Sequence, residues 1–87
     1  MPKLSIKLNF DNIEAICEIC NKYRDKFDVD VKYGRYTVDG CSILGVASLG
    51  GKRVEVKPIT DDPDLFYAFY EEICEWDSFK IDKGDEL

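Results

Sequence analysis

The spacing of apolar residues along this chain switches between two and three or four, and this succession restricts the folds that it can adopt. Leu4, Ile6 and Leu8 alternate with polar residues, as in a strand with one buried face. The apolar residues that follow recur at intervals of three or four, which predicts a helix from near Asp11 to about Lys26. Its apolar stripe consists of Ile13, Ile16, Cys17, Cys20, Tyr23 and Phe27.

Three further segments have the alternation that is typical of strands. Residues 29–33 and 36–38 alternate on either side of a short link that contains Gly34, so they predict a hairpin. Alternation returns at residues 54–57 and stops at Pro58. Because proline has no amide hydrogen to donate to a ladder, we expect Pro58 to end this strand or to lie at a sheet edge.

Two more helices are predicted by their start and stop signals. Residues 41–51 are small and apolar, with Ser42 as a candidate N-cap and Gly50-Gly51 as a left-handed stop, so a helix of about two turns fits. Residues 60–64 combine threonine, aspartates and proline, which favour the start of a last helix that frays near residues 77–79. The apolar face of the last helix consists of Leu65, Phe66, Phe69, Ile73 and Trp76.

The order of these elements predicts an α+β protein. Strands and helices do not repeat in the regular way of a doubly wound parallel sheet, and the hairpin makes at least part of the sheet antiparallel. We therefore expect an open-faced sandwich, with helices on one face of the sheet and solvent on the other. Residues 1–80 are predicted to form a single domain, and residues 81–87 a flexible C-terminal tail.

The charge of the chain argues against two classes of partner. Twelve basic and eighteen acidic residues give a net charge of −6, which repels the phosphates of nucleic acids and of anionic lipids. No apolar run approaches the roughly 20 residues that span a bilayer, and no secretory signal precedes the first strand. We therefore expect a cytoplasmic protein that binds neither nucleic acid nor membrane.

The four cysteines allow an alternative reading. Cys17 and Cys20 have the CxxC spacing of redox dithiols and of half a zinc site, and Cys41 and Cys74 could add ligands. However, the CxxC pair lies within the apolar stripe of the first predicted helix, where thiols act as small apolar side chains. We expect no metal and no cofactor, and a redox or metal-binding module remains the alternative.

One segment resembles a known family. Residues 41–50, Cys-Ser-Ile-Leu-Gly-Val-Ala-Ser-Leu-Gly, are similar without gaps to the Lys-Ser-Ile-Met-Gly-Leu/Val-Met-Ser-Leu-Gly segment of HPr, the histidine-containing phosphocarrier of the bacterial sugar phosphotransferase system. The order of elements over residues 3–77 is also similar to that of the family. The resemblance implies a four-stranded antiparallel sheet with two longer helices and one short helix on one face.

The phosphoacceptor of that family is missing here. In HPr the first helix opens with His-x-Arg-Pro, whereas this chain contains no histidine and the resemblance places Asp11 or Asn12 at that position. Asp11 and Glu14 would meet an incoming phosphate with negative charge, so we reject histidine phosphotransfer and expect no enzyme. A capping box formed by Asp11 and Glu14 explains these residues better than an acyl-phosphate acceptor at Asp11, although transfer to a non-histidine acceptor stays an alternative.

The resemblance also implies a regulatory role. Ser42 matches the serine that a dedicated kinase phosphorylates in many HPr proteins and in the catabolite-repression HPr, which likewise lacks the histidine. The family docks its protein partners through the positions of Ile43, Leu44, Val46 and Ala47. We therefore expect a protein partner, from the phosphotransferase system or its regulators, and a serine kinase; Ser42 acting only as a helix cap and the four apolar residues only packing on the sheet are the alternatives.

Overall fold

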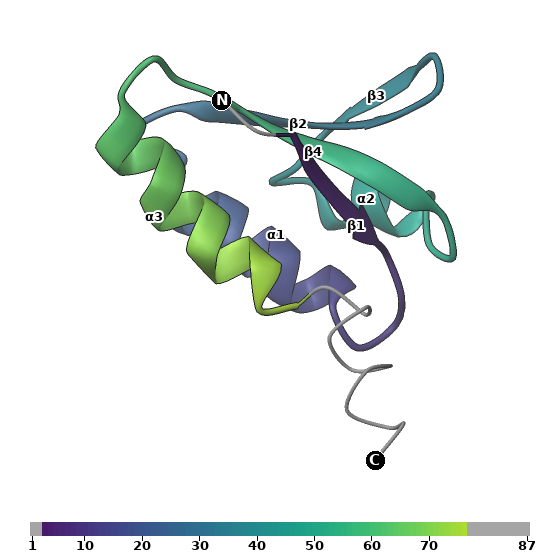
Figure 1. The fold of residues 1–87 in the computed structure, drawn as a ribbon. Coiled ribbons are helices and arrows are strands. Elements are labelled where there is room, and N and C mark those ends of the chain that lie inside the picture. The colour runs from purple at the N-terminus through teal and green to yellow at the C-terminus, as the bar shows by residue number, and fades with distance from the viewer. Residues whose placement is uncertain (1–2, 77–87) are drawn as a thin grey trace.

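Four strands and three helices make up residues 3–76, the part of the chain that the computed structural model describes (Figure 1). In chain order they are β1 (Leu4–Lys7), α1 (Ile13–Lys22), β2 (Asp28–Tyr33), β3 (Tyr36–Asp39), α2 (Ile43–Ala47), β4 (Arg53–Ile59) and α3 (Pro63–Cys74). This is the α+β order that the sequence predicts. The expected C-terminal tail at residues 81–87 and the fraying at residues 77–79 lie outside the described residues.

The sheet is antiparallel throughout, with the strand order β1-β4-β2-β3. Val56 of β4 lies opposite Leu4 of β1 on one side and opposite Val31 of β2 on the other, and Val31 lies opposite Val38 of β3. These residues belong to the set that alternates with exposed ones, so they form a continuous apolar row on the covered face. The other face is open to solvent, which confirms the open-faced sandwich.

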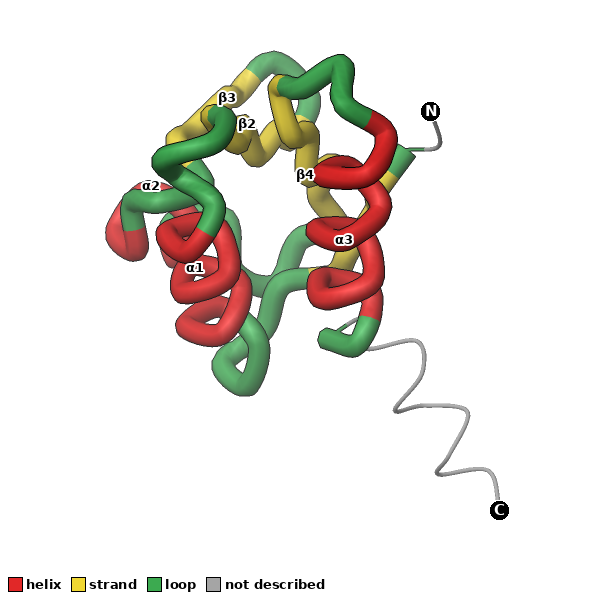
Figure 2. The backbone as a smooth tube through the Cα atoms, turned by 90° about the vertical axis from the view of Figure 1, so that its left-hand side faces the viewer, coloured by secondary structure: helices red, strands yellow, loops and turns green. Residues whose placement is uncertain are grey.

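Helices α1 and α3 lie on the covered face of the sheet, and α2 lies beside α1 (Figure 2). The end of α1 and the middle of α3 meet through three rings, those of Tyr23, Phe27 and Phe69, with centroids 5.4 to 5.6 Å apart. Offset or edge-to-face pairs of this kind contribute about 1 kcal/mol each beyond their buried area. These rings therefore pack the residues that follow α1 against α3.

The first helix is shorter than predicted. It ends at Lys22 rather than at about Lys26, because the amide of Tyr23 is shared between the carbonyls of Ile19 and Cys20, and Arg24 bonds the carbonyl three residues back. Such tighter turns end an α-helix. Phe27 is still buried as the apolar stripe predicts, since the turns carry it to the start of β2.

Pro58 lies inside β4 rather than at its end, so of the two expectations for this proline the one that it ends the strand is wrong. Strand β4 continues to Ile59, and Pro58 is paired with Val29 of β2. The pairing with β1 runs only as far as Val56 within the described residues, so at Pro58 the strand has one neighbour. The missing amide hydrogen is tolerated there because, as at a sheet edge, no second strand needs a hydrogen bond from this position.

Candidate functional site

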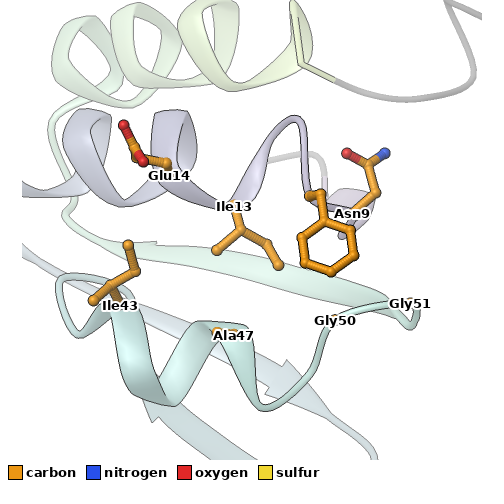
Figure 3. A pocket seen from close by; sticks show the side chains of 8 residues that line it. Asn9, Ile13, Glu14, Ile43, Ala47, Gly50 and Gly51 are labelled. Carbon is orange, nitrogen blue, oxygen red and sulfur yellow. The ribbon is translucent and has the colours of Figure 1, made fainter.

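An open pocket of about 610 Å³ lies between the first turn of α1, the loop before it, and α2 (Figure 3). We call it the α1–α2 pocket, and it is lined by Asn9, Phe10, Ile13, Glu14, Ile43, Ala47, Gly50 and Gly51. Figure 3 shows Ile13 projecting from α1 toward α2. The fold thus brings Phe10 and Ile13, which flank the two positions implied for the phosphoacceptor, to the same pocket as the segment that resembles HPr.

The entry to α1 is capped by a residue that the sequence analysis did not single out. The side-chain oxygen of Asn9 accepts hydrogen bonds from the amides of Asp11 (2.9 Å) and Asn12 (3.0 Å), and the Asn9 carbonyl accepts from the amide of Ile13 (3.0 Å). The predicted capping box is wrong, because no hydrogen bond within residues 3–76 joins the carboxylates of Asp11 or Glu14 to these amides. Asparagine side chains often accept a hydrogen bond from the backbone amide two residues further on, so Asn9 itself is the local signal that could have indicated this Asx-turn.

Asn12 is the N-cap residue of α1, and its side chain hydrogen-bonds to backbone groups of other segments. Its side chain is 2% exposed. The side-chain oxygen accepts from the Asn9 amide at 2.8 Å, and the side-chain nitrogen donates to the carbonyls of Lys7 (2.8 Å) and Trp76 (2.9 Å). One of the two positions implied for the phosphoacceptor therefore joins the end of β1 to the segment after α3, whereas Asp11, the other position, is exposed.

Helix α2 starts at the predicted Ser42 cap, but it is shorter than the predicted two turns because it ends at Ala47, before Gly50 and Gly51. The Ser42 hydroxyl oxygen accepts a hydrogen bond from the Gly45 amide at 3.3 Å, and Gly51 has a φ of 85°, the left-handed conformation that glycine adopts without strain. Ser42 is exposed and also lines a shallow hollow with Arg24, Asp28 and Asp39. A phosphate on Ser42 would thus have both a guanidinium and carboxylates near it.

The predicted partner-binding residues divide into two groups. Leu44 is 83% exposed and Ile43 47% exposed, and Ala47 is also exposed. Val46, in contrast, is fully buried in the core, so it does not belong to an accessible surface. A helix of five residues has to bury one side against the fold, and Val46 is the side chain that does so. Phe10, which the sequence analysis did not include, is fully exposed beside these residues.

The positions of the cysteines fit a role in packing better than a role in redox chemistry or metal binding. All four are free thiols, and Cys17 and Cys20 are buried in the stripe of α1. Burial, followed by the neighbouring Cys41, raises the pKa of Cys17 and raises that of Cys20 to about 12, and burial also raises the pKa of Cys41. These shifts disfavour the thiolate, which is the reactive and metal-binding form. Within residues 3–76 no group of three or more ligands is placed to hold a metal ion.

Comparison with known proteins identifies the architecture. No family model and no curated protein matches this sequence. Among solved structures, the chain is similar to the crystal structure of HPr-C-His from Thermoanaerobacter tengcongensis, with a TM-score of 0.63 and 17% sequence identity over 86% of this chain and 89% of that one. The fold is that of HPr. At this identity the likeness concerns the fold alone, and the four-stranded antiparallel sheet with its three helices is confirmed.

The HPr fold also places residues 41–50 opposite the entry of α1, the two segments on which the sequence resemblance bears. Residues 41–50 supply the start of α2 and the turn that follows it, and they face the entry of α1 across the α1–α2 pocket (Figure 3). None of the helices within residues 3–76 is long and apolar enough to cross a membrane.

Proposed function

We propose that this chain is an HPr-like protein-binding module that does not carry phosphate on histidine, and that it binds its partner at the α1–α2 pocket. The observation that supports this function is the exposure of Phe10, Ile43 and Ala47, which line the pocket. Clustered exposed apolar side chains cost free energy in water, and in soluble proteins they mark interaction sites. The partner is a protein of the phosphotransferase system or one of its regulators.

The entry of α1 favours binding over phosphoryl transfer. The chain has no imidazole, and Asn12 offers a buried carboxamide that is already fully hydrogen-bonded. A carboxamide is not a phosphate nucleophile, and the exposed carboxylates of Asp11 and Glu14 repel an incoming phosphate. The module therefore acts without an enzymatic step of its own.

Ser42 is the proposed regulatory site. Its hydroxyl is exposed directly before the exposed residues Ile43 and Leu44. A phosphate there adds about two negative charges beside the apolar surface, and these charges oppose the desolvation that docking of an apolar partner requires. Phosphorylation of Ser42 would thus lower the affinity for the partner. The four free thiols fit the reducing cytoplasm, and a serine kinase would phosphorylate this module there.

Phosphorylation by an HPr serine kinase tests this function. The wild-type chain is incubated with the kinase and ATP and then analysed by intact mass. We expect the wild type and Ser48→Ala to gain the mass of one phosphate and Ser42→Ala to gain none. Ser48 is the matched control, because it is an exposed serine of the same segment whose hydroxyl donates to the Gly45 carbonyl at 2.6 Å.

The same assay tests docking. Phe10→Asp, a change at a fully exposed residue that lines the pocket, should be phosphorylated about tenfold more slowly than the wild type, which corresponds to the loss of one interface hot spot. Tyr67→Asp is the control, because Tyr67 is exposed on α3 and does not line the pocket. No phosphate on the wild type would rule out Ser42 as a regulatory site, and equal rates for Phe10→Asp and Tyr67→Asp would rule out the α1–α2 pocket as the docking surface.

A further inference from the structure

The charge around the α1–α2 pocket defines the chemistry of its partner. Glu14 is the charged residue among those that line it, and its side chain is exposed on the first turn of α1 (Figure 3). Glu18, one helical turn further along, is exposed as well, and so is Asp11 just before the helix. The α1 side of this apolar pocket is therefore acidic.

The nearest lysines along the chain do not neutralise this acidic side. Lys52 directly follows the pocket residue Gly51, but its ammonium lies over the Tyr33 ring, 5.1 Å from the centroid. Lys7 belongs to the exposed set of β1, which points away from the helices. Lys22, at the far end of α1, is paired with Glu72 of α3 at 2.7 Å. Within residues 3–76, the carboxylate of Glu14 is thus left to a partner.

A second copy of this chain would fit the pocket poorly. Self-association through this face would bring two acidic rims together, and each chain carries a net charge of −6. Like charges brought face to face are a strong element of discrimination against a partner. The occupant that complements the surface is a different protein, with apolar side chains for the pocket and positive charge for its rim.

We infer that the α1–α2 pocket accepts an apolar segment of a partner protein that is flanked by lysine or arginine, with a basic side chain opposite Glu14. The inference rests on the proposed function, since it specifies the partner of the same surface. Exposed ion pairs contribute modestly, so the charge should alter the affinity by about fivefold, whereas the apolar contacts provide most of the binding.

Two synthetic helical peptides test this preference. Both carry leucines at positions i, i+3, i+4 and i+7, and the flanking positions are lysine in one and glutamate in the other. Each is titrated into the ¹⁵N-labelled full chain while amide shifts are recorded. We expect the lysine peptide to shift the amides of residues 9–14 and 43–51, and the glutamate peptide to bind about fivefold more weakly.

Charge-reversal variants complete the test. Glu14→Lys should remove or invert the preference for the lysine peptide. Glu71→Lys makes the same change in net charge on an exposed residue of α3 that does not line the pocket, and it should leave the preference unchanged.

Several results would overturn the inference. Equal binding of both peptides at the pocket would refute the charge preference while leaving the docking surface intact. Shifts outside the pocket, or no shifts with either peptide, would refute the apolar-basic partner. Pocket amides that shift as the chain alone is concentrated would identify a second copy as the occupant. Because the kinase assay uses neither peptide, its outcome judges the proposed function separately.

Discussion

The two sides of the α1–α2 pocket differ in what they keep of the HPr pattern. On the α2 side, the segment at residues 41–50 has the cap, the turn and the exposed apolar side chains that the resemblance implies. On the α1 side, one of the two positions that the resemblance implies for the histidine is occupied by Asn12, which is buried and bonded to Lys7 and Trp76. Exposed apolar side chains suited to binding thus lie beside Asn12, a buried residue whose hydrogen bonds hold the fold together.

The largest effect is expected on the α1 side. Asn12→Ala removes three hydrogen bonds and leaves the carbonyls of Lys7 and Trp76 without their partner. Because unsatisfied buried polar groups are costly, we expect the free energy of unfolding to fall by about 3 kcal/mol. Urea denaturation of the two purified proteins measures the difference.

Asp11→Ala is the matched control for Asn12→Ala. Its carboxylate is exposed and accepts no hydrogen bond from the helix amides, so the stability should change by less than about 0.5 kcal/mol. Similar losses for Asn12→Ala and Asp11→Ala would contradict the view that Asn12 has the structural role.

On the α2 side, the stabilities of two variants distinguish a residue that packs in the core, Val46, from one that is exposed, Leu44. Val46→Ala removes two methyl groups from a fully buried site and should cost about 2 kcal/mol in stability. Leu44→Ala removes a larger side chain that is 83% exposed, and its stability should stay within about 0.5 kcal/mol of the wild type. Thermal unfolding of both variants checks this; an equally large loss for Leu44→Ala would mean that Leu44 packs rather than binds.

The cap of α2 should have a smaller effect. Ser42→Ala removes an acceptor of the Gly45 amide in a helix of five residues, and we expect a loss of about 0.5 kcal/mol because this hydrogen bond is long, at 3.3 Å. Ser42→Asp should recover most of the loss, since aspartate is a good N-cap. Parallel urea titrations provide the measurement, and a loss above that of Val46→Ala would show that Ser42 has a larger structural role than its contacts indicate.

The smallest expected effect lies at the other end of α1, where the Tyr23 hydroxyl donates to Glu72 at 2.6 Å. This hydrogen bond and the burial of the ring raise the pKa of Tyr23 from 10.0 to about 12. A raised pKa contributes stability that is complete below pH 10 and is lost as the pH rises toward 12. We therefore expect Tyr23→Phe to lose less stability than the wild type over this alkaline range.

The acidic range tests the same contact from its other partner. The hydrogen bond from Lys22, followed by that from Tyr23, lowers the pKa of Glu72. A lowered carboxyl pKa contributes stability that is present above pH 4.5 and is lost as the pH falls through the folded-state value. Glu72→Gln should flatten this acidic decline. Identical pH profiles for the wild type, Tyr23→Phe and Glu72→Gln would contradict the assigned coupling.

The elements that could be predicted from the sequence are those with local signals. Helix α2 begins at the predicted Ser42 cap, the left-handed Gly51 lies in the turn that follows this helix, and α3 begins at the predicted aspartate and proline, with Asp62 as its cap. The core stripe of α1 also follows directly from its spacing.

The role of Asn12 could not be predicted, because it depends on partners far along the chain. Trp76 is 64 residues away from Asn12, and no periodicity connects them. Likewise, the alternation in β1 and β4 predicts two strands but not that β4 lies between β1 and β2. Phe10 was missed for a different reason: it lies outside both predicted apolar stripes, and only the fold shows that it lines the same pocket as Ile43 and Ala47 of α2.

The central claim is that the α1 side of the pocket no longer accepts phosphate. Incubation of the chain with Enzyme I and radiolabelled phosphoenolpyruvate tests it most directly, with an HPr that retains its histidine as the positive control. We predict label on the control and none on this chain. Label on this chain that maps to the peptide containing Asp11 and Asn12 would contradict the claim.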